Sequence, residues 1–213
     1  MATTQSLVEI AYTSIRENII NANYMPGTLL SENELAEILN MSRTPIRGAI
    51  SRLESEGFVS SLRNRGIIVK ELSLKQILDI HEVFFFLQEF SAEGAIEKRF
   101  SFNKEDLEMY LSQQLKAEEN NDYPKYVHYS LLFTRSLISA SNNQQMVQIM
   151  DSIKDKLIQF SIVNWKLTPN QKHYRANSVN KSIYEAICSE NHSKIKQICK
   201  ENISNELGNI NQI

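Results

Sequence analysis

Two closely spaced helix-start signals constrain the fold of this chain more than any other feature. Ser31 and Glu34 have the S-x-x-E spacing of a capping box, in which each side chain hydrogen-bonds the other residue's backbone N–H. Ser42 then provides a favourable N-cap for the next helix, and Pro45 falls in that helix's first turn, where its missing N–H costs little. Gly57 lies where a left-handed residue ends the helix that begins after Ser42. The pattern predicts two helices joined by a very short turn.

Short β-prone segments flank these two helices. A pair of leucines precedes them, and a hairpin follows them with Gly66 in the turn of its "RNRG" connection. An amphipathic helix comes first in the chain, with apolar residues at helical spacing. The order helix, strand, helix, helix, hairpin indicates a winged helix-turn-helix domain over residues 1–71. The β-prone segments are 29–30, 58–62 and 67–70.

No further hairpin signal occurs after Ser73. Helical patterns there are interrupted by Asn, Asp and Ser, which favour caps and turns over helix interiors. We therefore predict an all-α bundle of about six helices over residues 72–213, and a fold class that is mostly α. The expected helices are 73–98, 103–120, 123–141, 143–165, 170–189 and 191–208.

The charge of the chain is distributed unevenly. Its formal net charge is −2, so a surface that binds nucleic acid would have to be local. The segment from Ser42 to Lys70 contains six cationic residues and two glutamates, which gives a local charge of +6 − 2 = +4. The residues in this count are Arg43, Arg47, Arg52, Arg63, Arg65 and Lys70, with Glu54 and Glu56.

The first turn of the third helix concentrates this charge. Arg43 and Arg47 are one turn apart, with Thr44 beside them, and all three lie off the apolar stripe of the helix. The N-terminal residues of a helix in the major groove contact base edges and phosphates. Arg63 and Arg65 bracket the wing tip, from which phosphates or the minor groove are within reach. The alternative interpretation is a charged helix face that is merely solvated.

Several other classes of protein are disfavoured. The run "VFFFL" at 83–87 is far shorter than the ~20 residues of a membrane span, and the N-terminal residues lack the layout of a signal peptide. Cys188 and Cys199 suggest reduced thiols rather than disulfides. A cytoplasmic protein without a membrane association is expected.

No catalytic motif is present in the sequence. It contains no HExxH, no GxSxG and no glycine-rich phosphate loop, so we do not expect an enzyme. The four histidines are interpreted as surface or structural residues.

The stretch "LSENELAEILNMSRTPIRGAISRLESEGFVSSLRNRGIIV" resembles the DNA-binding domain of the GntR family of bacterial transcription regulators, and the resemblance covers roughly residues 7–69. It implies that Arg43 and Arg47 contact bases or phosphates and that Gly66 approaches the minor groove. Asn33 stands where some members have a phosphate-contacting arginine. The expected DNA-binding residues are Asn33, Ser42, Arg43, Thr44, Arg47, Arg63, Arg65 and Gly66.

The second half is similar to the FCD effector domain of the FadR-type branch, and six helices favour its VanR-like subgroup. The segments "SLLFTRSLISASNN" and "NKSIYEAICSENHSKIKQICKEN" align with the stretches that hold a divalent metal in many members. The positions of the metal ligands are occupied by Ser130, Thr134, Asn180 and Asn202, which are poor ligands for a transition metal. The resemblance thus implies a pocket without a metal or other cofactor. A shifted register, with His128 or His173 as ligands, is the alternative.

The same resemblance places an effector pocket in the bundle. The run "EVFFFLQE" puts Phe84 where the family often has an arginine, and Gln88 near its glutamate. Without that cation, the pocket suits a neutral or weakly polar small molecule. Alternatively, its polar residues only satisfy one another around buried water. The expected pocket residues are Phe84, Gln88, Ser130, Thr134, Asn180 and Asn202.

These interpretations combine into one functional hypothesis. The chain is expected to be a ligand-responsive transcription regulator, acting as a repressor, that binds double-stranded DNA at a short inverted-repeat operator as a homodimer. The alternatives are a DNA-binding dimer without an effector, and a metal-dependent regulator that uses shifted ligands.

Overall fold

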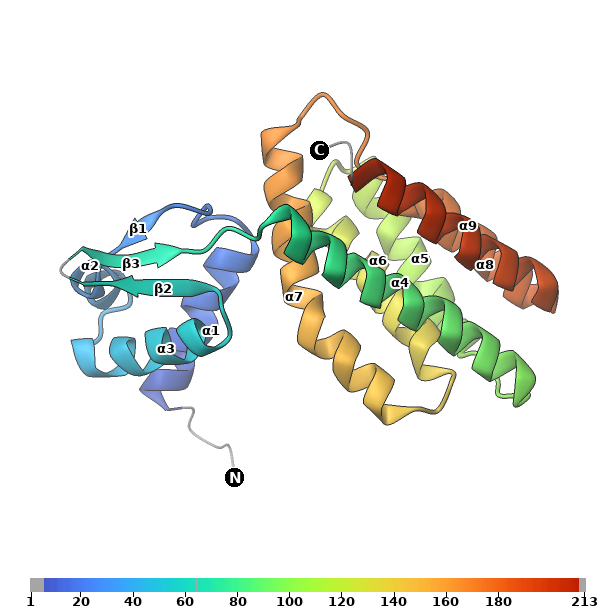
Figure 1. The fold of residues 1–213 in the computed structure, drawn as a ribbon, viewed down its shortest axis with the longest axis horizontal. Coiled ribbons are helices and arrows are strands. Elements are labelled where there is room, and N and C mark those ends of the chain that lie inside the picture. Colours follow the sequence, from blue (N-terminus) through green and yellow to red (C-terminus); the bar gives the residue numbers. More distant parts are fainter. Residues whose placement is uncertain (1–5, 64, 211–213) are drawn as a thin grey trace. The chain divides into compact units, whose positions relative to one another are not determined.

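The structure is a computed structural model that describes residues 6–63 and 65–210, with side chains described up to residue 202. The chain divides into two compact units, Met1–Leu72 and Ser73–Ile213. Both units can be followed in Figure 1, the first in blue and cyan and the second from green to red.

The first unit is a winged helix-turn-helix, as the sequence predicts. Helices α1 and α3 pack against each other, and the short helix α2 packs against α3. The core residues Ile15, Ile19, Leu35, Ile46 and Leu53 are almost completely buried. The elements are α1 (Leu7–Ile20), β1 (Leu29–Leu30), α2 (Glu32–Ile38), α3 (Arg43–Ser55), β2 (Val59–Leu62) and β3 (Gly66–Val69).

The local signals that define this unit form the expected hydrogen bonds. The Glu34 N–H donates to Ser31 Oγ at 3.1 Å, and the Ser31 N–H donates to Glu34 Oε2 at 3.2 Å, which is the capping box. At the end of α3, Gly57 has φ +83° and the Phe58 N–H donates to the Leu53 carbonyl oxygen at 2.9 Å. This left-handed ending turns the chain directly into β2.

The three strands form an antiparallel sheet in the order β1-β3-β2. Leu62 pairs with Gly66 at the tip of the hairpin, and Leu30 pairs with Ile67. Gly66 has φ +98°, and a Cβ atom on it would lie 2.6 Å from the Leu30 carbonyl oxygen. Glycine is therefore needed here both for the backbone conformation and for the close approach of β1.

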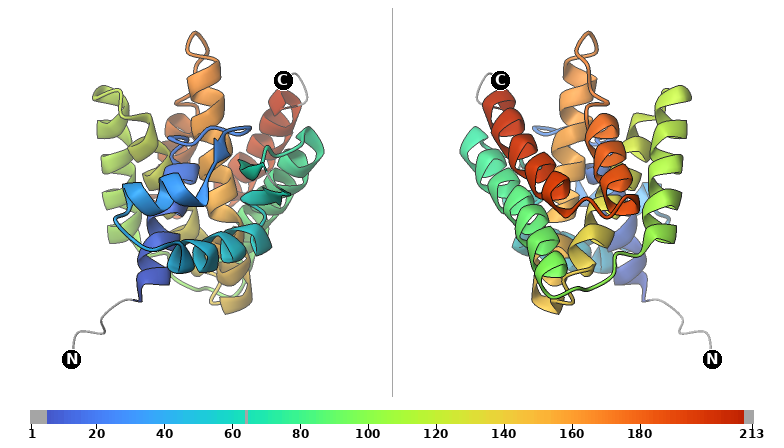
Figure 2. Two further views of the ribbon diagram at one scale, coloured as in Figure 1. Left: turned by 90° about the vertical axis from the view of Figure 1, so that its left-hand side faces the viewer. Right: turned by 90° about the vertical axis from the view of Figure 1, so that its right-hand side faces the viewer.

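The second unit is a bundle of six helices in its described part, which confirms the predicted class. Phe133, Leu137 and Ile183 lie at the centre of its main apolar cluster. Helices α4 and α9 run side by side (Figure 2, right). None of the described helices is long and apolar enough to cross a membrane. The helices are α4 (Leu74–Glu97), α5 (Lys104–Glu119), α6 (Tyr123–Ser139), α7 (Gln144–Leu167), α8 (Ala176–Cys188) and α9 (His192–Ile210).

One helix begins later than the sequence pattern indicates. The expected start of α8 was residue 170, but the helix begins at Ala176 and residues 168–175 form a connecting segment. Within this segment His173 Nε2 lies 2.7 Å from the Thr168 carbonyl oxygen, and in a long-range contact the Tyr174 hydroxyl donates to Asn121 Oδ1 at 3.0 Å. The Ala176 N–H donates to the Tyr126 hydroxyl oxygen at 2.9 Å. A local sequence pattern cannot reveal such distant partners.

Candidate nucleic-acid interface and ligand cavity

The N-terminal turn of α3 presents its polar side chains to solvent. Ser42, Arg43, Thr44 and Arg47 are exposed, whereas Ile46 is fully buried. The helical period produces this division, because the residues of the buried stripe hold α3 against the core. The structure thus brings together on one exposed turn four of the residues expected to bind DNA.

Ser42 occupies the N-cap position of α3 but makes no side-chain capping hydrogen bond. The usual donor to such a hydroxyl is the N–H at the third helical position, and that position is Pro45, which has none. No acidic residue lies in the first turn of α3. The positive end of the helix dipole and its exposed N–H groups therefore lie beside two arginines, which is a favourable environment for a phosphate.

The two arginines differ in their surroundings. Arg47 Nε lies 2.8 Å from Glu32 Oε2, and the Arg47 side chain is 65% exposed. The Arg43 side chain has no hydrogen-bond or ion-pair partner among the residues that the structure describes. An exposed ion pair contributes about 0–1 kcal/mol, so DNA can displace Glu32 from Arg47 at a small cost.

We expect Glu32→Gln to strengthen DNA binding by up to about fivefold, because it removes a negative charge that competes with DNA for Arg47. Fluorescence anisotropy with a labelled operator duplex measures this change. Glu37→Gln, an exposed charge change elsewhere on α2, is the matched control. A loss of affinity in Glu32→Gln would mean instead that Glu32 holds Arg47 in its binding orientation.

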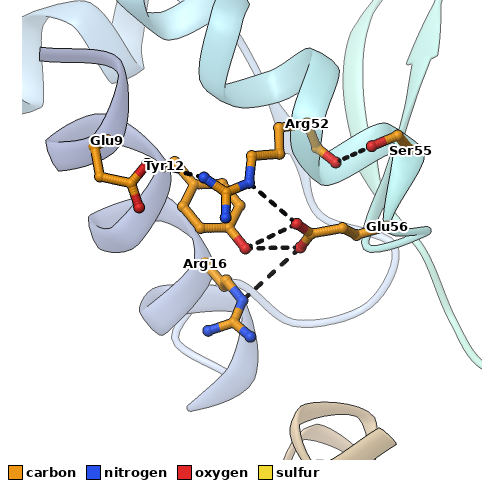
Figure 3. A network of polar contacts seen from close by, with 6 residues as sticks. All are labelled: Glu9, Tyr12, Arg16, Arg52, Ser55 and Glu56. Carbon is orange, nitrogen blue, oxygen red and sulfur yellow. Dashed lines mark hydrogen bonds and ion pairs between the residues drawn. The ribbon is translucent and has the colours of Figure 1, made fainter. Parts of the chain in front are cut away.

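Arg52 belongs to a structural network rather than to the exposed cationic turn (Figure 3). Its guanidinium lies 3.6 Å from the centroid of the Tyr12 ring, and its Nη1 is 2.8 Å from Glu9 Oε2. Its Nε is 3.2 Å from Glu56 Oε1, and Glu56 also accepts a hydrogen bond from the Tyr12 hydroxyl at 2.8 Å. Burial and this hydrogen bond raise the pKa of Tyr12. The network joins α1 to α3.

The local charge stays the same when Arg52 and Glu56 are left out of the count. Five cations and one anion remain between Ser42 and Lys70, which gives +5 − 1 = +4. The remaining anion, Glu54, accepts hydrogen bonds from the Ser61 N–H at 2.6 Å and from the Ser61 hydroxyl at 2.9 Å. The cationic character of this region therefore belongs to the α3 turn and the wing.

The other expected DNA-binding residues lie on α2 and around the wing. Asn33 is exposed in the first turn of α2, and Arg63 and Arg65 are exposed on either side of the hairpin tip. Gly66 begins β3 and is partly buried against Leu30. Its conformation gives it a structural role in the wing, and its approach to the minor groove remains a prediction.

A cavity of about 450 Å³ lies within the helical unit. All six residues expected in the effector pocket line it. Helix α4 supplies Phe84 and Gln88, α6 supplies Ser130 and Thr134, and α8 and α9 supply Asn180 and Asn202. Residues far apart in the sequence thus converge on one space whose volume suits a small molecule.

Part of this polar lining is satisfied internally. Asn180 Nδ2 donates to Gln114 Oε1 at 2.9 Å and to Ser130 Oγ at 3.5 Å, and the Thr134 hydroxyl donates to the Ser130 carbonyl oxygen at 3.2 Å. Gln88 differs, because its side chain is 2% exposed and has no hydrogen-bond partner among the described residues. Hydrogen bonds among the lining residues therefore account for only part of the polar groups in the cavity.

The donor set of the cavity does not fit a transition metal. Within the described residues, no three His, Cys, Asp or Glu side chains gather where they could hold a metal ion. Of the two alternative ligands, His173 is one of the described lining residues and His128 is not. The hydroxyl and amide oxygens of Ser130, Thr134, Asn180 and Asn202 in the lining are poor ligands for a transition metal.

Sequence reasoning missed several lining residues. His81, Lys172 and Arg175 border the cavity, together with His173, which the sequence offered only as an alternative metal ligand. The last three belong to the segment 168–175, which the sequence pattern assigned to a helix. Only their charge and their position just after Pro169 could have indicated from the sequence that they line the cavity. Tyr123 also lines the cavity, and its ring stacks on the Trp165 ring with the centroids 5.2 Å apart.

Known proteins resemble both units of the chain. Residues 7–69 match the model of the bacterial regulatory proteins of the gntR family, and residues 79–205 match the FCD domain model. An HTH-type transcriptional regulator from the TAR-I ttuE-ttuC' intergenic region of Agrobacterium vitis is 32% identical over 63% of this chain and 80% of its own length. The gluconate operon transcriptional repressor of Bacillus subtilis (strain 168) is 26% identical over 78% of this chain and 68% of its own. The solved structure of E. coli McbR/YncC superposes with a TM-score of 0.74 at 18% identity, over 98% of this chain and 99% of that one.

Proposed function

The chain belongs to the GntR family of bacterial regulatory proteins and carries an FCD domain, and from this premise we propose that it represses transcription from a short inverted-repeat operator as a homodimer. It is a DNA-binding transcription regulator and not an enzyme. The six helices described for its FCD domain support a place in the VanR-like subgroup. A similar protein is named as the repressor of a gluconate operon, which favours repression over activation.

The observation that carries this proposal is the exposed cationic turn at the start of α3. Arg43, Thr44 and Arg47 project away from the core next to an uncapped helix N-terminus, in a region with a local charge of +4. We assign Arg43 and Arg47 to bases or phosphates, and Ser42 and Thr44 to the phosphate nearest the helix end. Arg63, Arg65 and Gly66 on the wing, with Asn33 on α2, would add contacts along the backbone and minor groove.

We infer the dimer from the way a winged helix-turn-helix domain binds DNA. A single recognition helix spans only one half-site, and a two-fold symmetric pair of chains reads an inverted repeat. We propose that the helical unit, whose α4 exposes Phe86 and Phe90, provides the dimer contacts.

We further propose that a small molecule in the cavity, bound without a metal, changes the affinity for the operator. Gln88 supports this, because it lines the cavity and has no hydrogen-bond partner among the described residues, so its amide group is available to a ligand. Coupling requires that the ligand bind more tightly to one of two arrangements of the protein. The second candidate is a dimer without an effector, which the Gln114–Asn180–Ser130 hydrogen bonds favour.

Footprinting on the DNA upstream of the protein's own gene tests the main proposal. We expect protection of an inverted repeat, with two chains per duplex in sedimentation velocity. Protection of an asymmetric site by one chain, or uniform coating of DNA without a preferred site, would contradict it.

A further inference from the structure

Helices α1 and α3 contact each other at three successive levels. On each helix the contacting residues are four apart, so they share one face of α1 and one face of α3. A slide or rotation of α3 against α1 would therefore disturb all three contacts together. The three pairs are Val8 with Gly48, Tyr12 with Arg52, and Arg16 with Glu56.

The first level is a close approach that glycine makes possible. Gly48 lies in the interior of α3, where glycine is a poorer helix former than alanine. A Cβ atom on Gly48 would lie 3.1 Å from Val8 Cγ1 and 3.3 Å from Val8 Cγ2. The Val8 side chain thus packs directly on the α3 backbone, and a larger residue at position 48 would change the spacing of the two helices.

The second and third levels are joined by one polar network (Figure 3). The buried Tyr12 ring lies under the Arg52 guanidinium, and Glu56 links the two levels because it accepts the Tyr12 hydroxyl hydrogen bond and lies 3.9 Å from Arg16 Nε. Together with Glu9, the network contains two cations and two anions, so its net charge is zero. The intact network would therefore act on DNA binding through geometry rather than through charge.

The face of α3 that contacts α1 lies away from the exposed arginines. Arg52 follows Arg43 by nine residues, about two and a half turns, so the two side chains leave α3 on about opposite sides. The orientation that α1 gives to the helix thus decides where Arg43 and Arg47 point. Base contacts depend on this orientation more than phosphate contacts do, because a guanidinium must align with both acceptors of a guanine edge.

We propose that the three α1–α3 levels are positioning contacts, which hold Arg43 and Arg47 in register with the base edges and thereby set the specificity for the operator. Their own side chains need not touch DNA. This inference rests on the proposed function, since it requires an operator. Disturbing one level should lower the preference for the operator without lowering the general affinity for DNA.

The quantity that tests this proposal is a ratio of two affinities, one for the operator duplex and one for a duplex of the same composition in scrambled order. Fluorescence anisotropy measures both affinities at one salt concentration, because non-specific binding depends steeply on salt. Partial unfolding lowers both affinities by the same factor and leaves the ratio unchanged. The ratio therefore reports the position of α3 rather than the stability of the fold.

Glu56→Gln separates geometry from charge. The change removes a negative charge, so electrostatics alone would tighten binding to both duplexes. We expect instead that affinity for the operator falls at least about fivefold, while affinity for the scrambled duplex stays the same or rises. Glu37→Gln removes an exposed negative charge from α2 and is the matched control, with a ratio within about twofold of the original.

Gly48→Ala disturbs the first level and offers a rescue. Alanine favours the helix, but its Cβ would press on Val8, so we expect the ratio to fall at least about threefold. Adding Val8→Ala removes both Cγ atoms and should return the ratio to within about twofold of the original. A new methyl group that clashed with the DNA itself would not be rescued in this way.

The outcomes distinguish this inference from the proposed function. A ratio that stays within twofold of the original in Glu56→Gln or in Gly48→Ala would overturn the inference, although the original protein still prefers its operator. A loss in Gly48→Ala that Val8→Ala does not restore would overturn it as well. If the original protein shows no preference for the operator, the proposed function itself fails, and this inference fails with it.

Discussion

Replacing both Arg43 and Arg47 with alanine is expected to weaken operator binding by at least about 100-fold while the chain remains folded. Each arginine that contacts a base or phosphate contributes about 1–3 kcal/mol, and a dimer would lose four of them. Neither side chain contributes to the core, because both are exposed and the only described partner of the pair is Glu32. Fluorescence anisotropy with the operator duplex measures the affinity, and circular dichroism with thermal melting measures the fold.

A control with the same change in charge separates local contacts from net charge. Lys104→Ala with Lys181→Ala also removes two exposed cations, but from the helical unit. This control should bind the operator within about twofold of the original protein, since it lies outside the proposed interface and bulk charge is screened beyond about 8 Å at physiological salt. Equal losses in the two double variants would show that general charge, rather than the α3 turn, determines binding.

Gly66→Ala is expected to destabilise the DNA-binding unit by at least about 3 kcal/mol. An alanine at φ +98° costs roughly 1–3 kcal/mol in backbone strain, and its Cβ would also lie 2.6 Å from the Leu30 carbonyl oxygen. Both β1 and the wing would have to shift. A change of 1 kcal/mol moves the melting temperature of a unit of this size by about 4–8 °C, so calorimetry of the full chain should show a large effect.

Gly27→Ala is the matched control for this substitution. Gly27 has a similar φ of +84°, but an added Cβ would meet no atom within 4 Å. It should therefore suffer the backbone strain alone, roughly 1–3 kcal/mol, and lose less stability than Gly66→Ala. Similar losses in the two variants would mean that the contact between β3 and β1 does not require glycine, and hydrogen exchange of the β3 amide groups would locate the difference.

The sequence predicted those parts of the fold that short-range rules determine. The capping box of Ser31 and Glu34, the left-handed Gly57 and the polar breaks before α5, α6 and α7 are local signals, and each of them is found in the structure. The division of α3 into exposed arginines and buried Ile46 also follows from helical period alone. These rules were enough to place both units and the candidate DNA-binding turn.

Long-range contacts decided what the sequence could not show. The segment 168–175 departs from the helical pattern because Tyr174 and the start of α8 hydrogen-bond to Asn121 and Tyr126, which are distant in the sequence, and this is what brings Lys172 and Arg175 to the cavity. Likewise, Arg52 and Arg47 are the same type of residue on the same helix. Only the position of Arg52 opposite Tyr12 on α1 shows that it has a structural role.

The central claim is that a local cationic surface on an acidic chain binds DNA. The most direct test of this claim is the salt dependence of operator binding. If Arg43, Arg47, Arg63 and Arg65 of both chains in a dimer contact phosphates, a plot of log Kobs against log salt concentration approaches a slope of about −7. We expect a slope steeper than about −4 that becomes shallower in the Arg43→Ala, Arg47→Ala variant. A slope near zero, or the same slope in both proteins, would contradict it.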